Sequence, residues 1–305
     1  MARRRIPWRV IISRRKGRRL MSTLTLVNGV VSDCIPVSDR GLGYGHGLFE
    51  TVRIHRGRAL LWERHRARLQ HGASRLCIPL DNVLPRLELW RDDLLHRAHP
   101  DSVAERCGVL KLVVTAGTGE RGYALPAEAS PAVIMTWQPG PSRQLLSPAR
   151  LRVCTQRLAH QPALAGIKHL NRLEQVLARA EWQGAAWDEG ITLDQDGAVV
   201  ECTSSNLFML RGGRWYTPAL ERAGVAGVMR DLLLTEIMPA CGQASTVVDG
   251  LRLDDLEQAD EVFICNAITG VRPVAELEQQ SRWSTWPVTD ALRTHLSAHY
   301  EYASP

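Results

Sequence analysis

Lys168 is the first residue whose type and surroundings suggest chemistry. It precedes apolar residues at helical spacing, from Leu170 to Ala180, so the segment AGIKHLNRLEQVLAR predicts an amphipathic helix that begins near Lys168. A fixed ammonium group is disfavoured at the positively charged start of a helix. A lysine that reacts as a neutral amine, or that is bound as an imine, loses nothing there. An exposed lysine at a frayed helix end is the more common alternative.

Glu201 is a carboxylate inside an apolar segment, AVVECTSSNLF, that predicts a strand. Two interpretations remain open. Glu201 is either a surface group on an edge strand or the counter-ion of a buried cation, such as a protonated pyridine nitrogen, because a buried carboxylate needs a partner.

Two further features suit a phosphate group. Gly224 and Gly227 directly precede the helix predicted from VMRDLLLTEIM, and free N–H groups at a helix start bind anions. Arg53, on a predicted strand, either pairs with a phosphate or extends to solvent. The glycine-rich segment RGLGYGHG lacks the dinucleotide fingerprint because position 46 is histidine, so no nucleotide site is expected. A Schiff-base lysine, an acid for a pyridinium, a phosphate cradle and a strand arginine together predict a pyridoxal phosphate site.

Composition limits the class of protein. The chain has 305 residues, 45% hydrophobic and 23% charged, as in soluble globular proteins, and no apolar run is long enough to cross a membrane. The net charge of +6 comes from residues 1–20, which hold eight arginines and one lysine, whereas the remainder is slightly acidic. This segment is interpreted as an extension outside the fold; a nucleic-acid or membrane arm and a targeting segment are the alternatives. Seven scattered cysteines, with no C-x-x-C, indicate a reducing cytoplasm and no metal site.

Two domains are expected. The sequence predicts a hairpin turned at Asn28-Gly29, helices over 62–76 and 82–96, and buried strands at GVLKLVVTAG and AVIMTWQPG. The proline-rich segment 138–148 is the best linker candidate. We therefore expect a small α/β domain at 21–139 and a larger domain at 140–305, with the site in the cleft between them.

Five segments in order resemble the fold type IV pyridoxal phosphate enzymes, which include branched-chain and D-amino-acid aminotransferases. The segments are VSDRGLGYGHGLFETVR, LAGIKHLNRLEQVLAR, VVECTSSNLF, AGVAGVMRDLL and ADEVFICNAITGVRPV. The resemblance covers about residues 24–275, and within the family it is strongest to the aminodeoxychorismate lyases. It implies a mixed α/β fold with a small N-terminal domain and a larger barrel-like C-terminal domain, usually in a homodimer.

The resemblance also implies roles for individual residues. Lys168 would hold the pyridoxal phosphate and Glu201 would pair with its pyridine nitrogen. The phosphate would be surrounded by Arg53, the N–H groups of Val228 and Met229, and Asn266 with Ala267. Two departures are visible: His46 stands where the lyases commonly have aspartate, and Asn171-Arg172 replaces a tyrosine that aminotransferases carry after the lysine.

The implied reaction converts 4-amino-4-deoxychorismate to 4-aminobenzoate and pyruvate by Schiff-base exchange, proton abstraction by Lys168 and elimination of enolpyruvate. Thr51 and Lys168 are the candidates for protonating the leaving ether, and Arg121 and Asn171 are candidates for binding the substrate. An aminotransferase on the same scaffold is the first alternative. A non-catalytic protein that binds nucleic acid through its basic arm is the second, and it leaves Lys168 and Glu201 unexplained.

Overall fold

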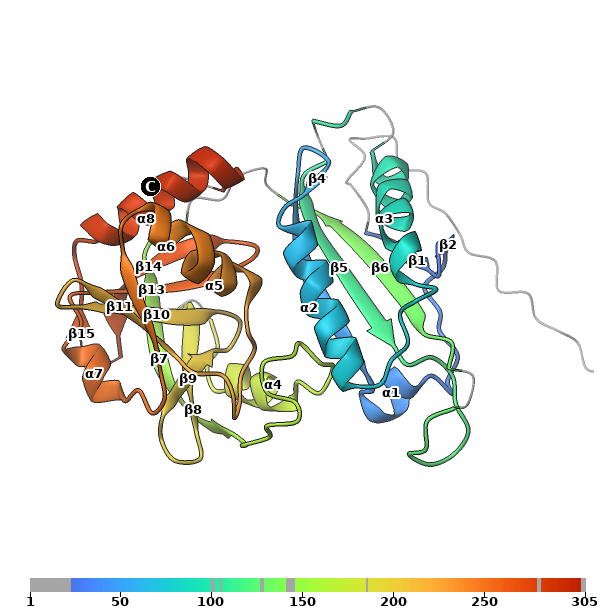
Figure 1. Ribbon diagram of the computed structural model, residues 1–305, viewed down its shortest axis with the longest axis horizontal. Helices are drawn as coiled ribbons and strands as arrows, with labels where there is room; N and C mark the ends of the chain where they lie inside the picture. Colours follow the sequence, from blue (N-terminus) through green and yellow to red (C-terminus); the bar gives the residue numbers. More distant parts are fainter. Residues whose placement is uncertain are drawn as a thin grey trace, which may run out of the picture.

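Two β-sheets, each with its own helices, make up the computed structural model (Figure 1). The structure describes residues 23–99, 102–104, 106–126, 129–140, 146–184, 186–278 and 281–302. The basic segment 1–20 and residues 141–145 of the expected linker lie outside the described residues. In the described segments, no helix combines the length and the apolar character that crossing a membrane requires.

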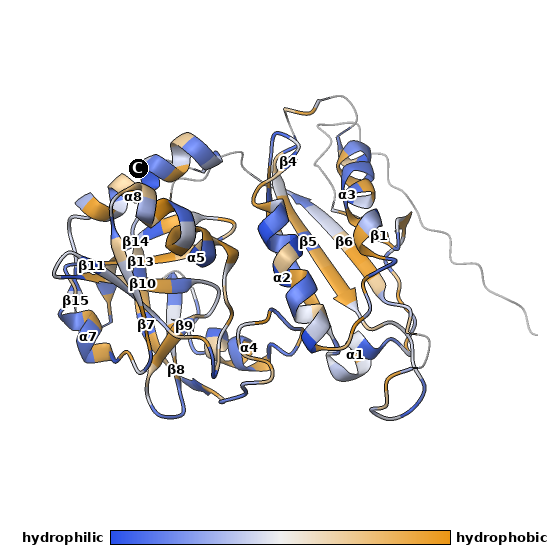
Figure 2. Ribbon diagram, viewed as in Figure 1, coloured by the Kyte–Doolittle hydropathy of each residue, from blue (hydrophilic) through white to orange (hydrophobic). Residues whose placement is uncertain are grey.

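The first sheet is antiparallel throughout, with strand order β2-β1-β6-β5-β3-β4. Its strands are β1 (Leu24–Val27), β2 (Val30–Val31), β3 (Gly47–His55), β4 (Arg58–Ala59), β5 (Gly108–Thr115) and β6 (Ala132–Pro139). The predicted hairpin is confirmed: Asn28 and Gly29 have φ values of 50° and 80°, the left-handed conformations that a tight hairpin turn requires. Figure 2 shows hydrophobic residues along β5, in the interior of this sheet.

Three helices accompany the first sheet: α1 (Arg40–Tyr44), α2 (Trp62–Arg75) and α3 (Leu84–Ala98). The two longer helices were predicted from their spacing and are confirmed. Leu69 of α2 and Leu94 of α3 are buried against the sheet with Trp137 of β6. In Figure 1, α2 lies on the side of the sheet that faces the rest of the molecule. Helix α2 can therefore carry side chains from the first sheet toward the second.

The second sheet is mixed and curled, with the order β12-β11-β10-β13-β14-β7-β8-β9 and β15 paired to β14. Its strands are β7 (Ala149–Leu158), β8 (Glu189–Asp194), β9 (Val199–Cys202), β10 (Asn206–Arg211), β11 (Arg214–Pro218), β12 (Ala244–Val248), β13 (Glu261–Asn266), β14 (Gly270–Leu277) and β15 (Ser281–Arg282). The parallel pairs are β7 with β8, β14 with β7, and β11 with β12. The expected mixed α/β fold with a larger barrel-like unit is confirmed.

Alternate residues of the second sheet enter separate apolar clusters. Phe208 and Phe263 stack with ring centroids 4.9 Å apart in one cluster, whereas Leu207 and Ile264 belong to another. The helices are α4 (Leu173–Ala180), α5 (Val228–Leu232), a π-helical turn (Leu233–Ile237), α6 (Met238–Ala240), α7 (Leu253–Glu257) and α8 (Pro287–Tyr300). The predicted helix start near Gly227 is confirmed, because α5 begins at Val228.

The prediction that a helix begins near Lys168 is wrong. Helix α4 begins five residues later, at Leu173, and Lys168 lies in an extended segment that pairs with β3. The apolar spacing suggested a buried stripe, but Leu173 and Leu177 are 75% and 56% exposed. A helix start therefore does not account for the properties of Lys168.

Packing of α2 gives the first testable prediction. Leu69→Ala removes a side chain that is 1% exposed, so we expect a loss of about 2–5 kcal/mol in the free energy of unfolding. Leu89→Ala on α3 is the matched control, because Leu89 is 68% exposed and should change stability by less than about 0.5 kcal/mol. Urea titration measures both, and equal effects would contradict the packing described.

Candidate active site

The segment around Lys168 is held on both sides by backbone hydrogen bonds. On one side, the Phe49 N–H donates to the Lys168 carbonyl and the Leu170 N–H donates to Gly47, each at 2.9 Å. On the other side, Gly166 donates to Gly224 at 3.0 Å and accepts from Ala226 at 2.9 Å. The lysine is thus fixed between the first sheet and the loop that precedes α5.

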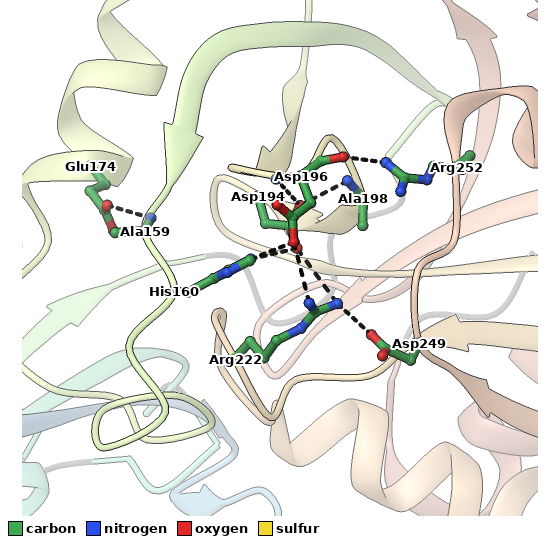
Figure 3. Close-up of polar contacts among 9 residues, drawn as sticks. All are labelled: Ala159, His160, Glu174, Asp194, Asp196, Ala198, Arg222, Asp249 and Arg252. Carbon is green, nitrogen blue, oxygen red and sulfur yellow. Dashed lines mark hydrogen bonds and ion pairs between the residues drawn. The ribbon is translucent and has the colours of Figure 1, made fainter.

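A charged cluster anchors the two loops of this second pairing (Figure 3). His160 Nε2 lies 2.9 Å from the Asp194 carboxylate, and Arg222 contacts Asp196 at 3.4 Å and Asp249 at 2.7 Å. The Arg222 carbonyl also accepts from the N–H of Gln161, which follows His160 directly. Although burial alone would raise the pKa of Asp194, hydrogen bonds from His160 and from backbone amides lower it.

In the described segments, this cluster contains the one group of side chains that could together hold a metal ion. The group consists of His160, Asp194 and Asp196. Arg222 lies against both aspartates and already supplies a positive charge there. We assign the cluster to loop anchoring, and the absence of a metal site stays a prediction.

A cavity of about 660 Å³ lies at the junction of the two sheets. It receives side chains from β3, α2, the Lys168 segment, α4, β9 and the loops after β11 and β13. The predicted residues that line it are Thr51, Lys168, Glu201, Val228, Asn266 and Ala267. Lining residues that sequence reasoning missed include Phe49, Arg68, Gln175 and Arg179.

The Lys168 amine makes no direct contact with an acid among the described residues. Its Nζ lies 4.5 Å from the centroid of the Phe49 ring, and among the described residues it has no hydrogen bond or ion pair. Burial lowers the pKa of Lys168 to about 8; the nearby cations Arg68 and Arg172 contribute, whereas Glu50 and Glu201 oppose the shift. A substantial fraction of the amine is therefore neutral near physiological pH, as a nucleophile or base requires.

Glu201 is buried although β9 is the last strand of the sheet. Only 6% of the residue is exposed, and its Oε2 accepts from the Val225 N–H at 2.9 Å and from Asn206 at 3.4 Å. Burial raises the pKa of Glu201 to about 7, against the lowering effects of the Val225 N–H and the cations Arg172 and Lys168. These facts favour the counter-ion interpretation over a surface carboxylate, because a cation delivered by a ligand would stabilise the ionised form.

A buried ion network, missed at the level of sequence, connects β3 to this cavity. Glu50 of β3 accepts from Arg68 Nε at 2.8 Å and from His65 Nδ1 at 2.6 Å, and a second Arg68 nitrogen binds the same carboxylate. Although burial alone would raise it, Arg68 and His65 bring the pKa of Glu50 down to about 2. Arg68 also donates to the Ala226 carbonyl at 3.1 Å. A carboxylate inside an otherwise mostly apolar strand was the sequence signal that could have revealed Glu50.

Arg53 lies beneath the loop that follows β13. Its Nη1 donates to the Ile268 carbonyl at 2.6 Å, and its guanidinium lies 5.4 Å from the Tyr302 ring centroid. Asn266 Oδ1 accepts from the backbone N–H groups of Ile268 and Thr269, both at 2.9 Å, which fixes that loop. Arg53 shares a face of β3 with Phe49 and Thr51 because strand side chains alternate.

Comparison with known proteins decides the family. The family model described as amino-transferase class IV matches residues 47–277. The chain belongs to the class IV aminotransferase family. It is 35% identical to an aminodeoxychorismate lyase of Vibrio harveyi over 88% of this chain and 96% of that protein. It is 28% identical to a D-alanine aminotransferase of Bacillus licheniformis, over 87% and 92% of the two chains.

Solved structures agree with this assignment. A 4-amino-4-deoxychorismate lyase from Pseudomonas aeruginosa has a TM-score of 0.82 and 44% identity, covering 92% of this chain and all of its own. The branched-chain aminotransferase of Escherichia coli, at 21% identity and a TM-score of 0.76, shows the same fold. Enzymes of this fold type use pyridoxal phosphate.

The residues present fit that cofactor. The unpartnered Lys168 amine and the Glu201 carboxylate line one cavity, and the first helical residue of α5 and the Asn266 loop line it too. The backbone N–H groups at a helix start have no intrahelical acceptor and suit a phosphate. A lysine for the aldehyde, an acid for the pyridine nitrogen and N–H donors for the phosphate are the required set.

Some predicted site residues are not brought to this cavity within one chain. Arg121 and Asn171 are exposed, and Asn171 Nδ2 donates to the Gly45 carbonyl at 3.2 Å. Met229 is fully buried in the apolar cluster of the larger sheet. None of these three is among the residues that line the cavity, and neither is Arg53. Their proposed roles stay predictions.

The electrostatics of Lys168 give a second testable prediction. In the cofactor-free protein, acetylation of Lys168 by acetic anhydride should reach half its maximal rate near pH 8, because burial and nearby cations lower the pKa of the lysine to about 8. In the urea-unfolded chain the midpoint should return toward the ordinary value of 10.5. Peptide mass spectrometry measures the label.

Arg68→Gln should raise the folded midpoint, because it removes a neighbouring cation. Arg64→Gln on the same helix is the matched control, since Arg64 contacts Asp231 and Glu236. A midpoint that is the same in the folded and unfolded chains would contradict this description.

Proposed function

We propose that the protein is a pyridoxal phosphate-dependent lyase that converts 4-amino-4-deoxychorismate to 4-aminobenzoate and pyruvate. The observation that carries the proposal is the Lys168 amine, partly neutral and without an acidic partner, in one cavity with buried Glu201. The similarity to two lyases, at 35% and 44% identity, supports this reaction over other reactions of the family.

Lys168 has two tasks in this proposal. Its amine binds the cofactor aldehyde and yields that place to the substrate amine. When bound, the cofactor withdraws electrons from the carbon that bears the substrate nitrogen, which acidifies the C–H bond. The released Lys168 amine then takes that proton, and its lowered pKa suits a general base at neutral pH.

Glu201 and Thr51 have the remaining roles in the proposed reaction. Ionised Glu201 would keep a proton on the pyridine nitrogen of the cofactor. The Val225 N–H holds the carboxylate in place inside the buried site. The ring becomes aromatic when it has lost the proton and the ether C–O bond has broken, with the bonding electrons leaving on the enolpyruvate oxygen. The enolpyruvate then gains a proton and becomes pyruvate. The Thr51 hydroxyl, which lines the cavity, is the proposed donor of that proton, with protonated Lys168 as the other.

The reaction itself is the third testable prediction. The wild-type holoenzyme mixed with aminodeoxychorismate should form fluorescent 4-aminobenzoate, and Lys168→Ala should reduce the rate by at least about 10²–10⁴-fold, the contribution of a positioned base. Lys111→Ala is the control, because Lys111 is exposed on β5. Undiminished product from Lys168→Ala would contradict the proposal. A holoenzyme that makes no product but accepts an amino group from an amino acid would support the aminotransferase alternative.

We further propose a homodimer that covers the outer face of α4. Leu173 and Leu177 are 75% and 56% exposed on this helix, and large apolar side chains in a row typically mark a contact surface. The double change Leu173→Glu and Leu177→Glu should convert the dimer to a monomer in sedimentation velocity. Leu89→Glu, on an equally exposed leucine of α3, should leave it a dimer. A monomeric wild type would contradict this assembly.

We also propose that the two domains meet at residues 139–140, where β6 ends. A cytoplasmic location is supported by the seven cysteines, none of which forms a disulfide in the structure. No nucleic-acid or membrane partner is proposed.

A further inference from the structure

Three polar side chains on α4 and at its N-cap line the cavity, whereas the leucines of α4 do not. Arg172, the N-cap residue of α4, lines the cavity together with Gln175, Val176 and Arg179 of the helix itself. Leu173 and Leu177 face away from the cavity and are exposed. The helix is anchored by Ala178, which is fully buried with Cys154 and Trp182 in an apolar cluster, so its polar side chains at the cavity are not what packs it. The inward polar row therefore needs an explanation other than packing.

The first member, Arg172, is held in place before any ligand arrives. Its Nε donates to the His169 carbonyl at 2.8 Å and its Nη2 donates to the Ile167 carbonyl at 3.3 Å. Among the described residues it forms no ion pair, and Nη1 has no hydrogen bond. Burial lowers the pKa of Arg172, so an anion at this place would relieve a desolvated charge.

The other two members also have unused hydrogen-bonding groups. Gln175 Oε1 is buried without a partner in the part of the chain that the structure describes, and no bond is made by its Nε2 either. The Arg179 guanidinium lies 4.5 Å from the Trp182 ring centroid and donates one bond to the Trp182 carbonyl. It has no acidic partner among the described residues. A buried amide left unpaired is costly and points to an absent ligand.

The charges of the cavity leave two cations unassigned. Glu50 neutralises Arg68, and the proposed cofactor engages Lys168 and Glu201. Arg172 and Arg179 then remain on one wall, with the Gln175 side chain between them in sequence. Two guanidinium groups on one wall of a cavity can each bind one carboxylate of a ligand that carries two.

We propose that the α4 row of Arg172, Gln175 and Arg179 binds the carboxylate groups of a dicarboxylate substrate and so makes the site selective for such substrates. This inference rests on the proposed function for the identity of the substrate, although the selectivity it describes can be measured without turnover. It also gives the substrate-binding role expected of Arg121 to residues that line the cavity.

The test uses two unreactive probes on the wild-type holoenzyme. The probe 3-(carboxymethoxy)benzoate has two carboxylates, and 3-methoxybenzoate keeps the ring and ether with one. Neither has an amine, so neither can react with the cofactor. Isothermal titration calorimetry should show at least about tenfold tighter binding of the dicarboxylate, about 1.4 kcal/mol. Equal binding of the two probes would overturn the proposal.

Two variants locate the preference on α4. Arg179→Gln removes a cation, and Gln175→Glu places a negative charge in the row without a large change in side-chain size. Each should reduce the dicarboxylate preference to less than about threefold while changing binding of the monocarboxylate little. Gln175→Glu keeps the test valid if loss of the contact between Arg179 and Trp182 unfolds the helix.

Arg157→Gln is the matched control, because Arg157 is exposed on β7 and does not line the cavity. It should keep the wild-type preference. Unchanged preference in both Arg179→Gln and Gln175→Glu would also overturn the proposal. The two proposals can fail separately. A wild type that forms no 4-aminobenzoate but still prefers the dicarboxylate probe would contradict the lyase reaction and leave the role of α4 intact.

Discussion

The backbone pairing that fixes the Lys168 segment is the constraint on which the rest of the site depends. A short extended stretch is hydrogen-bonded to β3 on one side and to the 224–226 loop on the other, so one lysine is held at the junction of the two sheets. Arg68 reinforces the same junction by bonding both Glu50 of β3 and the Ala226 carbonyl. The cavity, the lysine and the 224–226 loop are thereby positioned by one connected set of contacts.

Charge placement then determines what this geometry can do. Burial favours the neutral forms of both Lys168 and Glu201, and the opposite charges around them offset this only in part. A ligand with a cationic group beside Glu201 would stabilise the ionised carboxylate, and its aldehyde would react with the neutral amine of Lys168. The cationic row on α4 adds selectivity on a separate wall, because its arginines have no acids of their own among the described residues.

Local sequence patterns predicted much of the fold, including the Asn28-Gly29 turn and the long helices α2 and α3, because these depend on neighbouring residues. The family motifs also led to Lys168 and Glu201. The environment of Lys168 was misjudged because its segment pairs with a strand more than a hundred residues away, which periodicity does not report. Glu50 and Arg68 were missed for a similar reason, because Arg68 connects β3 to the Ala226 carbonyl, and the row on α4 was missed because the cavity that it lines is formed by segments distant in sequence.

The most direct test of the central claim is the attachment site of the cofactor. The chain has three lysines, Lys16, Lys111 and Lys168, and the Nζ of Lys111 also approaches the Phe49 ring, at 5.7 Å from its centroid. Reduction of the holoenzyme with borohydride, followed by peptide mass spectrometry, would mark the lysine that holds pyridoxal phosphate. The account predicts the modification on Lys168 alone. Modification of Lys111 or Lys16 with Lys168 unmodified would contradict it.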